Sequence, residues 1–388
     1  MRALLAANIG YSPRHAGAKH GPGAPRRRRL RAAALLIGAL ALVFAGSTVV
    51  VLRALGHPLN CPRGRTCATH DAAADRPTIP RAVVLSSHGL GLNGPTGAAY
   101  AAGRMWVTNN AGNSVSEFGW RSGAHPSIQR GPMFAEPSAI TSGRWHVWVA
   151  NALANSVTEL TAADGSVVRT ISVAGAPTSL ALYHGILWVA NSAPDSVSEF
   201  NVKTGKLVQT IKGHSLDSPE ALAISHGMLW IANAGSGTVT VLRASTGAWR
   251  ATIDRHQLAV KDPMAEVASA TMLWVAGANG IAEFSTIRIH MVLRIAGPRY
   301  GLQAPRAMVL ARGDLWVANM RGNSVTEIDA ATGRLVRVLA APLYHFNHPA
   351  GIAAYHRRIW VTNSGDASVT VLDLPARHGA IHQGTPKP

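Results

Sequence analysis

Histidine and acidic residues stand between the units of a pattern that repeats along this 388-residue chain. Imidazole and carboxylate groups bind polar ligands, transfer protons and coordinate divalent cations. Departures from a repeat are places where a function is grafted onto a scaffold, so we predict a ligand-binding site built from several of these connecting loops. The candidate residues are His88, His214, Asp217, Glu220, His256, Asp262, His345 and His348.

A second set of polar residues recurs at one position of the repeat. Asparagine stands three residues after a periodic tryptophan in six copies, and Gly277 replaces it in the fifth copy. A ring of amides could offer donors and acceptors to a ligand, but Asn also favours turns because its side chain hydrogen-bonds the nearby backbone. We favour the turn role. The six residues are Asn109, Asn151, Asn191, Asn233, Asn319 and Asn363.

The fifth copy is irregular in a second respect, because its turn within the run 274–284 is two residues shorter than in the other copies. Such a turn either leaves a notch that admits a ligand or is a tolerated deletion. Glutamates also recur, but always at the same position of a copy, so a ring would spread them apart rather than pair them for acid and base catalysis. These glutamates are Glu117, Glu159, Glu199, Glu283 and Glu327.

Tryptophan recurs seven times at intervals of 40 to 44 residues, each time with a proline eleven residues before it. The copy at 176–211 contains four short apolar or alternating runs, separated by turn signals such as His184-Gly185. Four short strands in about 42 residues indicate a propeller blade rather than a helical repeat. A periodic aromatic in mid-strand indicates packing between blades rather than a carbohydrate platform. The tryptophans are Trp106, Trp148, Trp188, Trp230, Trp274, Trp316 and Trp360.

The two ends of the array complement each other. The seventh copy lacks a fourth strand, because Pro375 to Gly379 does not favour a strand, whereas Arg81 to Ser86 reads as a strand upstream of the first copy. We therefore predict an all-β fold at 79–374: a seven-bladed β-propeller of four-stranded antiparallel blades, closed by the N-terminal strand. Closure removes exposed sheet edges. A flexible C-terminal tail at 375–388 follows it.

The repeated runs Trp-Val-Ala-Asn, Ser-Val-Thr-Glu, Thr-Gly and Val-x-Thr-Ile resemble the YVTN-type β-propeller repeats. They are also similar to the NHL-like and virginiamycin B lyase-like propellers. The resemblance covers Arg81 to about Leu374 and implies the propeller fold. The lyases of this group use His and Glu with a divalent cation to open a cyclic ester, so the resemblance implies a metal-assisted lyase or hydrolase as an alternative function. They typically carry an acid where this chain has the Asn of Trp-Val-Ala-Asn.

An uncharged apolar run of 21 residues, at 32–52, follows the basic cluster Arg26 to Arg31. A helix of that length crosses a bilayer core of about 30 Å, and the basic flank favours a cytoplasmic N-terminus. We predict a basic cytoplasmic tail at 1–31, a single transmembrane signal anchor at 32–52 and an extracytoplasmic linker at 53–78. A cleaved signal peptide, which would leave a secreted protein, is the alternative.

Two cysteines, Cys61 and Cys67, lie in the predicted linker. An oxidising compartment would let them form a disulfide with each other. A metal site needs more ligands than this pair offers, and His70 is the only nearby candidate, so we expect no metal there.

The formal charge of +18 is unevenly distributed along the chain. Residues 1–53 carry nine basic residues and no acid, which leaves +9 for the remainder. With the propeller predicted outside the cytoplasm, we do not expect nucleic acid as a partner. The partners that we expect are the lipid bilayer, through 32–52, and an extracytoplasmic protein or envelope polymer. We therefore predict a membrane-anchored, non-catalytic binding module without a cofactor. A lyase that needs a divalent cation is the alternative, and a nucleic-acid-binding propeller is the third interpretation.

Overall fold

The computed structural model describes residues 79–340 and 342–375. The predicted cytoplasmic tail, membrane anchor and linker, the Cys61 and Cys67 pair, and all but the first residue of the C-terminal tail lie outside these ranges. Within the described ranges, no helix is long and apolar enough to cross a membrane. The described residues belong to one compact unit.

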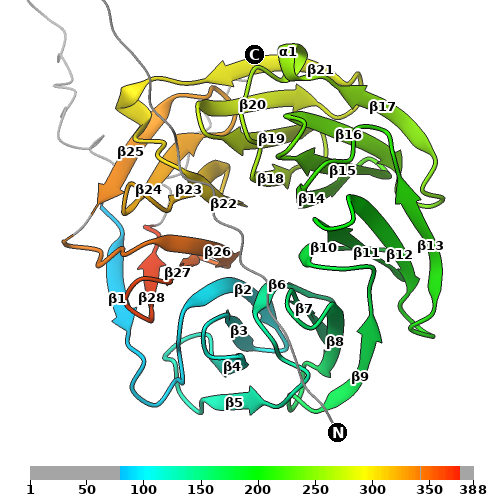
Figure 1. Cartoon of the computed structure of the whole chain (residues 1–388). Helices are drawn as coiled ribbons and strands as arrows, with labels where there is room; N and C mark the ends of the chain where they lie inside the picture. Colours follow the sequence, from blue (N-terminus) through cyan, green and yellow to red (C-terminus); the bar gives the residue numbers. More distant parts are fainter. Residues whose placement is uncertain (1–78, 341, 376–388) are drawn as a thin grey trace, which may run out of the picture. The chain divides into compact units, whose positions relative to one another are not determined.

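The described chain folds into seven antiparallel sheets of four strands each, arranged as a ring of blades (Figure 1). In blades 1 to 6 the strands follow one another in chain order across the sheet, as the predicted meander requires. Blade 1 contains β2 (Pro95–Ala101), β3 (Arg104–Asn109), β4 (Ser114–Gly119) and β5 (Ser127–Arg130). Blade 2 contains β6 (Pro137–Ser142), β7 (His146–Asn151), β8 (Ser156–Thr161) and β9 (Val167–Ser172). Blade 3 contains β10 (Pro177–Tyr183), β11 (Ile186–Asn191), β12 (Ser196–Asn201) and β13 (Leu207–Lys212).

The remaining blades have the same strand order, and two short helices lie in the connections before blades 5 and 6. Blade 4 contains β14 (Pro219–Ser225), β15 (Met228–Asn233), β16 (Thr238–Arg243) and β17 (Trp249–Ile253). Blade 5 contains β18 (Ala265–Ala268), β19 (Met272–Gly277), β20 (Gly280–Ser285) and β21 (His290–Ile295). Blade 6 contains β22 (Pro305–Ala311), β23 (Asp314–Asn319), β24 (Ser324–Asp329) and β25 (Leu335–Ala340). Blade 7 contains β26 (Pro349–Tyr355), β27 (Arg358–Asn363), β28 (Ser368–Asp373) and β1 (Arg81–Leu85). The helices are α1 (Arg255–Leu258) and η1 (Pro298–Tyr300).

The hydrophobic core lies between the blades. Each periodic tryptophan sits in the second strand of its blade, in a run of buried residues, and packs against neighbouring strands. Trp230 of blade 4, for example, shares a cluster with Leu273 and Val275 of blade 5. The predicted role of the tryptophans as packing between blades is confirmed. The fourth strands, by contrast, are mostly exposed or half-buried because they form the outer edge of each blade.

The N-terminal strand closes the ring. β1 pairs antiparallel with β28, from Arg81 opposite Asp373 to Leu85 opposite Val369, and so supplies the fourth strand of blade 7. The predicted closure is confirmed, except that the strand ends at Leu85 and Ser86 already belongs to the following loop. Both chain segments that lead out of the propeller therefore meet at the same end of blade 7.

A side chain also joins the last blade to the first. Arg358 of β27 pairs with Asp373, with Nε 2.6 Å from Oδ1, and donates to the backbone carbonyls of Trp120 and Arg121 in blade 1. Its guanidinium also lies over the Trp120 ring. These contacts span the seam at which the ring closes.

Substituting Arg358→Ala is expected to lower the free energy of unfolding by about 2 kcal/mol, because hydrogen bonds from a charged donor are each worth about 1.5–3 kcal/mol. Urea denaturation measures this change, and amide hydrogen exchange should rise first in β1 and β4. Arg104→Ala is the matched control, since Arg104 pairs with Glu117 within blade 1. If Arg104→Ala loosened β1 as much as Arg358→Ala does, Arg358 would not act at the seam.

Candidate functional site

The propeller has two faces that are built from different turns. The turns between second and third strands, together with the connections between blades, form one face, which we term the connection face. The other turns form the opposite face, which we term the entry face because Arg81 and Asp373, the ends of β1 and β28, pair there. The eight predicted ligand-binding residues lie in the connections or, for Glu220, next to one at the start of β14. All eight therefore belong to the connection face.

The recurrent asparagines do not face a ligand, because all six are fully buried. Asn191 Nδ2 donates to the hydroxyl of Ser198 at 3.0 Å, and in each of the other five copies the amide makes the same contact with the hydroxyl seven residues further on. The partner hydroxyl belongs to the third strand. The amides therefore hydrogen-bond the second strand to the third, and each Asn is also the last residue of the second strand before the turn.

The five candidate histidines are exposed and lie in four different connections. His214 stacks on Trp249 at the rim of blade 4, with ring centroids 5.5 Å apart. His345 and His348 share the connection from blade 6 to blade 7, and His88 lies in the connection from blade 7 to blade 1. Within residues 79–340 and 342–375, no three His, Cys, Asp or Glu side chains are close enough to hold a metal ion. The predicted loop residues are thus not gathered into one cluster.

Three of the eight candidates do converge, at a pocket of about 400 Å³ beside blades 4 and 5. His256 and Asp262 line it together with Arg255 and Lys261. Asp217 borders it, because its carboxylate lies directly against Gly235, which lines the pocket. The position of His256 is fixed by α1, whose N-cap Asp254 accepts hydrogen bonds from the backbone N–H groups of His256 and Gln257.

The shortened turn of blade 5 separates this pocket from a second one. Asn279 at the turn accepts a hydrogen bond from the Lys261 backbone at 2.7 Å. A Cβ at Gly277 would collide with the carbonyl oxygen of Lys261, so the segment before blade 5 occupies the space that an Asn takes in the other copies. The chain thus fills the space over Gly277 itself, and the two pockets lie on either side of the short turn.

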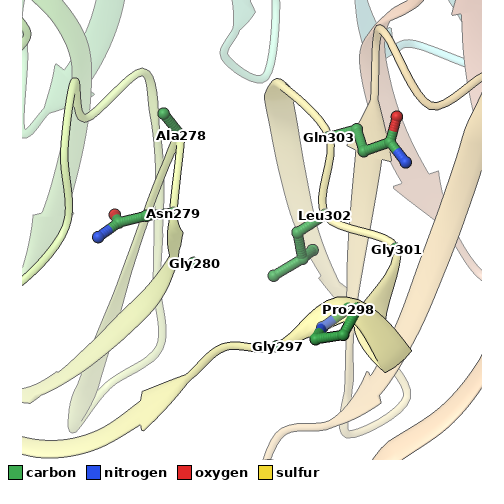
Figure 2. A pocket seen from close by; sticks show the side chains of 8 residues that line it. All are labelled: Ala278, Asn279, Gly280, Gly297, Pro298, Gly301, Leu302 and Gln303. Carbon is green, nitrogen blue, oxygen red and sulfur yellow. The ribbon is translucent and has the colours of Figure 1, made fainter. Parts of the chain in front are cut away.

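The second pocket has a volume of about 350 Å³ and lies between the turn of blade 5 and the connection to blade 6. Figure 2 shows Ala278 and Asn279 on one wall, and Leu302 and Gln303 on the other. Amide and apolar groups line it, and it has no charged residue. This lining suits an uncharged part of a ligand.

One position near the start of each inner strand, on the connection face, changes in residue type in blades 4 to 6, beside the two pockets. In blades 1 to 3 the second residue of the inner strand carries a hydroxyl, which donates to the carbonyl of the proline that starts the next blade. These residues are Thr96, Ser138 and Thr178. The aligned residues of blades 4 to 7 are Glu220, Met264, Arg306 and Ala350. Blades 4 to 6 thus have two charged side chains and a thioether in place of the hydroxyl that bonds to the next blade in blades 1 to 3.

The two charged residues at this position pair across blade 5. Arg306 Nη1 lies 3.6 Å from Glu220 Oε2 and 4.0 Å from the sulfur of Met264. Burial raises the pKa of Glu220, and the Arg306 guanidinium offsets part of that rise. The Glu220 side chain is 16% exposed and the Arg306 side chain 41%, so a ligand at the face can reach the guanidinium.

A further acid, Glu266, lies on the inner strand of blade 5 between the strands that carry this pair. It stands eight residues before the tryptophan, where the other six copies have Ala98, Ile140, Leu180, Leu222, Met308 and Ile352. The residue as a whole is half-buried, but both carboxylate oxygens are shut off from solvent and have no hydrogen-bond partner. The burial of these oxygens is what governs titration, and it raises the pKa of Glu266 well above its usual value.

Sequence reasoning missed Met264, Glu266, Arg306 and Gln303. Counting back from each tryptophan gives the signal for three of them. The position ten residues before it changes from hydroxyl to charged or sulfur-bearing side chains, and the position eight residues before it changes once from apolar to acidic. Gln303 lies in an irregular connection and has no such signal.

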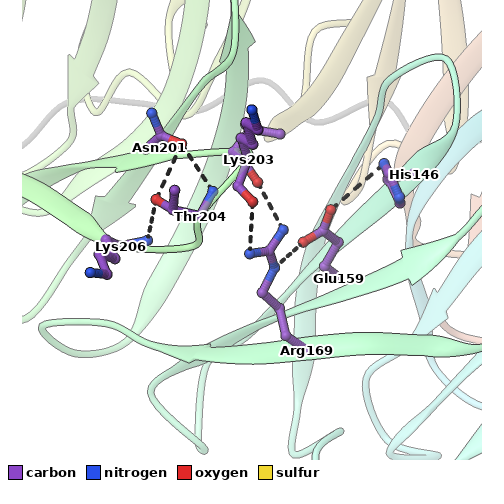
Figure 3. Close-up of polar contacts among 8 residues, drawn as sticks. His146, Glu159, Arg169, Asn201, Lys203, Thr204 and Lys206 are labelled. Carbon is purple, nitrogen blue, oxygen red and sulfur yellow. Dashed lines mark hydrogen bonds and ion pairs between the residues drawn. The ribbon is translucent and has the colours of Figure 1, made fainter.

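The recurrent glutamates are spread around the ring, as predicted, and two of them, Glu159 and Glu199, hold side chains that reach the next blade. Figure 3 shows Glu159 between Arg169 and His146, with Arg169 also reaching carbonyl groups of the next blade. Arg169 Nη2 donates to the Val202 carbonyl at 2.8 Å. In blade 3, Gln209 takes the place of the arginine and contacts Glu199 and the Thr246 carbonyl of blade 4. These polar links join adjacent blades and leave no pair of acids together.

Fold and geometry define a class: a closed seven-bladed β-propeller with a sector of charged residues over blades 4 to 6. No family model matches the chain, nor does any curated protein. Similar solved structures include a catalytically inactive variant of virginiamycin B lyase from Staphylococcus aureus with quinupristin, at TM-score 0.67 and 17% identity over 76% of this chain and 100% of that one. The selenomethionine form of that lyase has TM-score 0.65 and 17% identity over the same shares. A streptogramin B lyase has TM-score 0.65 and 14% identity over 76% of this chain and 98% of that one. The predicted resemblance to virginiamycin B lyase-like propellers is confirmed for the fold.

Proposed function

We propose that this chain is a non-catalytic binding module that takes up a short peptide-like ligand at blades 4 to 6 of the connection face. The observation that carries the proposal is the Glu220 and Arg306 pair across Met264, which stands where blades 1 to 3 have a hydroxyl bonded to the next blade. A ligand with an amino group and a carboxylate can bind both members of this pair, the amino group at Glu220 and the carboxylate at Arg306. Each residue then exchanges its ion-pair partner for a ligand group of the same charge.

The pockets beside the pair extend the same argument. Their volumes of about 400 and 350 Å³ fall in the range of small-ligand sites. One offers Arg255, His256 and Lys261 to polar side chains, and the other offers Asn279 and Gln303 to backbone amides. A rigid ring of blades holds these groups in place before the ligand arrives, which lowers the entropic cost of binding.

The test is thermal denaturation of the form that begins at Ala73, in the presence of a library of di- and tripeptides. Peptides that bind are expected to raise the melting temperature, and the double variant Glu220→Gln with Arg306→Met should weaken their binding by about tenfold or more. Isothermal titration calorimetry measures the dissociation constants. Arg321→Met is the matched control, because Arg321 is exposed on the same face in blade 6.

Two outcomes would count against the proposed site. Either no peptide in the library raises the melting temperature, or the double variant binds peptides as well as the unmodified chain does. An equal loss in Arg321→Met would show that net charge, rather than the Glu220 and Arg306 pair, determines binding.

A lyase or hydrolase that uses a divalent cation is the second candidate. It is favoured by the fold likeness to virginiamycin B lyase and by His256 and Asp262 lining one pocket. Melting in chelator and then in excess Mg²⁺, Mn²⁺ or Zn²⁺ tests it, since an ion at about 100 times its dissociation constant adds about 2.7 kcal/mol of stability. Stabilisation that is lost in His256→Ala would bring this candidate forward.

We also propose that the apolar run at 32–52 anchors the module in the membrane, with the propeller outside the cytoplasm. The support is the basic segment before the run and its bilayer-spanning length. The bilayer and an extracytoplasmic protein or envelope polymer are then the partners, and nucleic acid is not. Fractionation with an alkaline wash, followed by N-terminal sequencing, separates an intact anchor from a cleaved signal peptide.

A further inference from the structure

The turns of the two faces differ strongly in charge. Within residues 79–340 and 342–375, the turns of the entry face hold eight Lys and Arg residues and one acid. The turns and connections of the connection face hold four Lys and Arg residues and six acids. The entry-face residues are Arg121, Arg144, Lys203, Lys206, Arg288, Arg312, Arg334 and Arg357, with Asp164 as the acid. Those of the connection face are Arg255, Lys261, Arg299 and Arg321, with Glu136, Asp195, Asp217, Asp254, Asp262 and Asp366.

The basic groups of the entry face are available to a partner. Seven of the eight are exposed, and Arg312 is half-buried. They come from turns of blades 1, 2, 3, 5, 6 and 7, so they surround the ring rather than form one spot. The side chains of Arg144, Lys203 and Arg288 have no ion pair or hydrogen bond within the described part of the chain. A broad basic surface of this kind favours an extended anionic surface over a small ligand.

Two further features of the entry face fit a lipid headgroup layer. Trp145, at the turn of blade 2, is 65% exposed, and the Arg144 guanidinium lies 4.8 Å from its ring centroid. Tryptophan with a neighbouring basic residue is typical of the bilayer interface. A pocket of about 520 Å³ on the same face is lined by three arginines, Arg121, Arg357 and Arg358, and by one acid, Asp373, which is paired with Arg358. The other two guanidinium groups can contact a headgroup phosphate.

We propose that the entry face binds the surface of an anionic phospholipid bilayer. The chain enters the propeller at this face, through Arg81, and the sequence before it contains the apolar run at 32–52. The contact would leave the connection face, with its ligand site, directed away from the lipid. This inference adds an orientation to the proposed anchoring and does not depend on the identity of the ligand.

The size of the effect follows from membrane electrostatics. Each basic residue near an anionic leaflet strengthens binding by about fivefold, and the attraction decays over about 8 Å at physiological salt. Replacing three basic residues by acids should therefore weaken binding by about a hundredfold or more. Higher salt should weaken the binding of the unmodified protein in the same direction.

The experiment is sedimentation of the form that begins at Ala73 with vesicles of phosphatidylcholine alone or mixed equally with phosphatidylglycerol. This form lacks the predicted anchor, and its described residues belong to one compact unit with a closed ring, so lipid binding reports on the propeller rather than on the anchor. The test variant combines R144E, K203E and R288E. The control combines R130E, K212E and R321E, which makes the same charge change at exposed positions on the side of the connection face.

We expect binding to the mixed vesicles only, lost in the test variant and retained in the control, and reduced in Trp145→Ala. Equal binding to phosphatidylcholine alone, or equal loss in both triple variants, would overturn the proposal. So would tight binding to dextran sulfate without binding to the mixed vesicles, which would point to a soluble polyanion. Because no lipid is used to test the peptide site, the two proposals can fail separately.

Discussion

Replacing Glu266 by leucine is expected to raise the free energy of unfolding by about 2 kcal/mol at neutral pH. Both oxygens of this carboxyl are buried without a hydrogen-bond partner, in a ring position where six other copies are apolar. Leucine occupies the same position in blades 3 and 4, so the side chain should fit. The gain comes from removing a polar group that cannot be satisfied, and urea denaturation of the form beginning at Ala73 measures it.

The stability gained by Glu266→Leu should increase as pH rises. Burial raises the pKa of Glu266 in the folded state above its value in the unfolded chain, so between the two values the folded state binds more protons. Stability of the unmodified protein therefore falls as pH rises above about 4.5, the ordinary pKa of Glu, until the folded-state pKa is passed. The advantage of Glu266→Leu should be smallest in acid and grow with pH.

Two variants test the cause of this effect. Glu266→Gln should remove the pH dependence while it keeps a buried polar group, so it should be less stable than Glu266→Leu. Met308→Glu places an acid at the equivalent position of blade 6 and should destabilise the protein by a similar amount. A Glu266→Leu protein that is less stable at every pH would show that the carboxyl has a favourable partner in the fold.

A carboxyl kept at a cost in stability is a feature of functional sites rather than of cores. Glu266 lies on β18, which contacts both β14 with Glu220 and β22 with Arg306. Three ionisable side chains are therefore concentrated on three successive inner strands. This concentration is the reason for placing the binding site here rather than at the scattered histidines of the other connections.

The sequence predicts the fold of this protein better than its site, and the reason is physical. Seven tryptophans and prolines repeat because every blade meets the same packing problem, so each copy independently supports the same strands and the same core. The closing strand is predictable for a related reason, since Arg81 to Ser86 supplies what the last copy lacks. The site has no such redundancy: Asp217, His256 and Asp262 converge only because a particular connection folds back over Gly277.

The asparagines illustrate a structural rather than a ligand-binding use of a recurrent polar residue. The sequence favours a turn role for these six residues over a ring of amides around a ligand, and each amide is buried against a hydroxyl of the third strand. Recurrence in a repeat protein reflects the structural needs of every copy. The informative residues are those, such as Glu220 and Arg306, that replace the recurrent type in a few copies only.

Trp230→Ala is expected to lower the free energy of unfolding by about 4 kcal/mol, the usual range for a fully buried large aromatic. The Trp230 side chain is fully buried between blades 4 and 5, where it packs against Leu273 and Val275. The cavity would therefore weaken two blades, and amide exchange should rise in β15 and in β19. Urea denaturation followed by circular dichroism gives the change in stability.

Trp249→Ala in the same blade is the matched control, because Trp249 is 52% exposed on β17, where it stacks on the His214 ring and its Nε1 donates to Thr252 Oγ1. Its loss should cost less than about 1 kcal/mol, as for most surface substitutions outside the core. The comparison measures how much the packing role that the sequence indicates for the recurrent tryptophans contributes to stability. If the seven were a platform for ligands, Trp230→Ala would leave stability nearly unchanged. A loss of several kcal/mol confined to Trp230→Ala would instead show that the recurrent tryptophans hold adjacent blades together, so that ligand recognition depends on the residues that differ between blades.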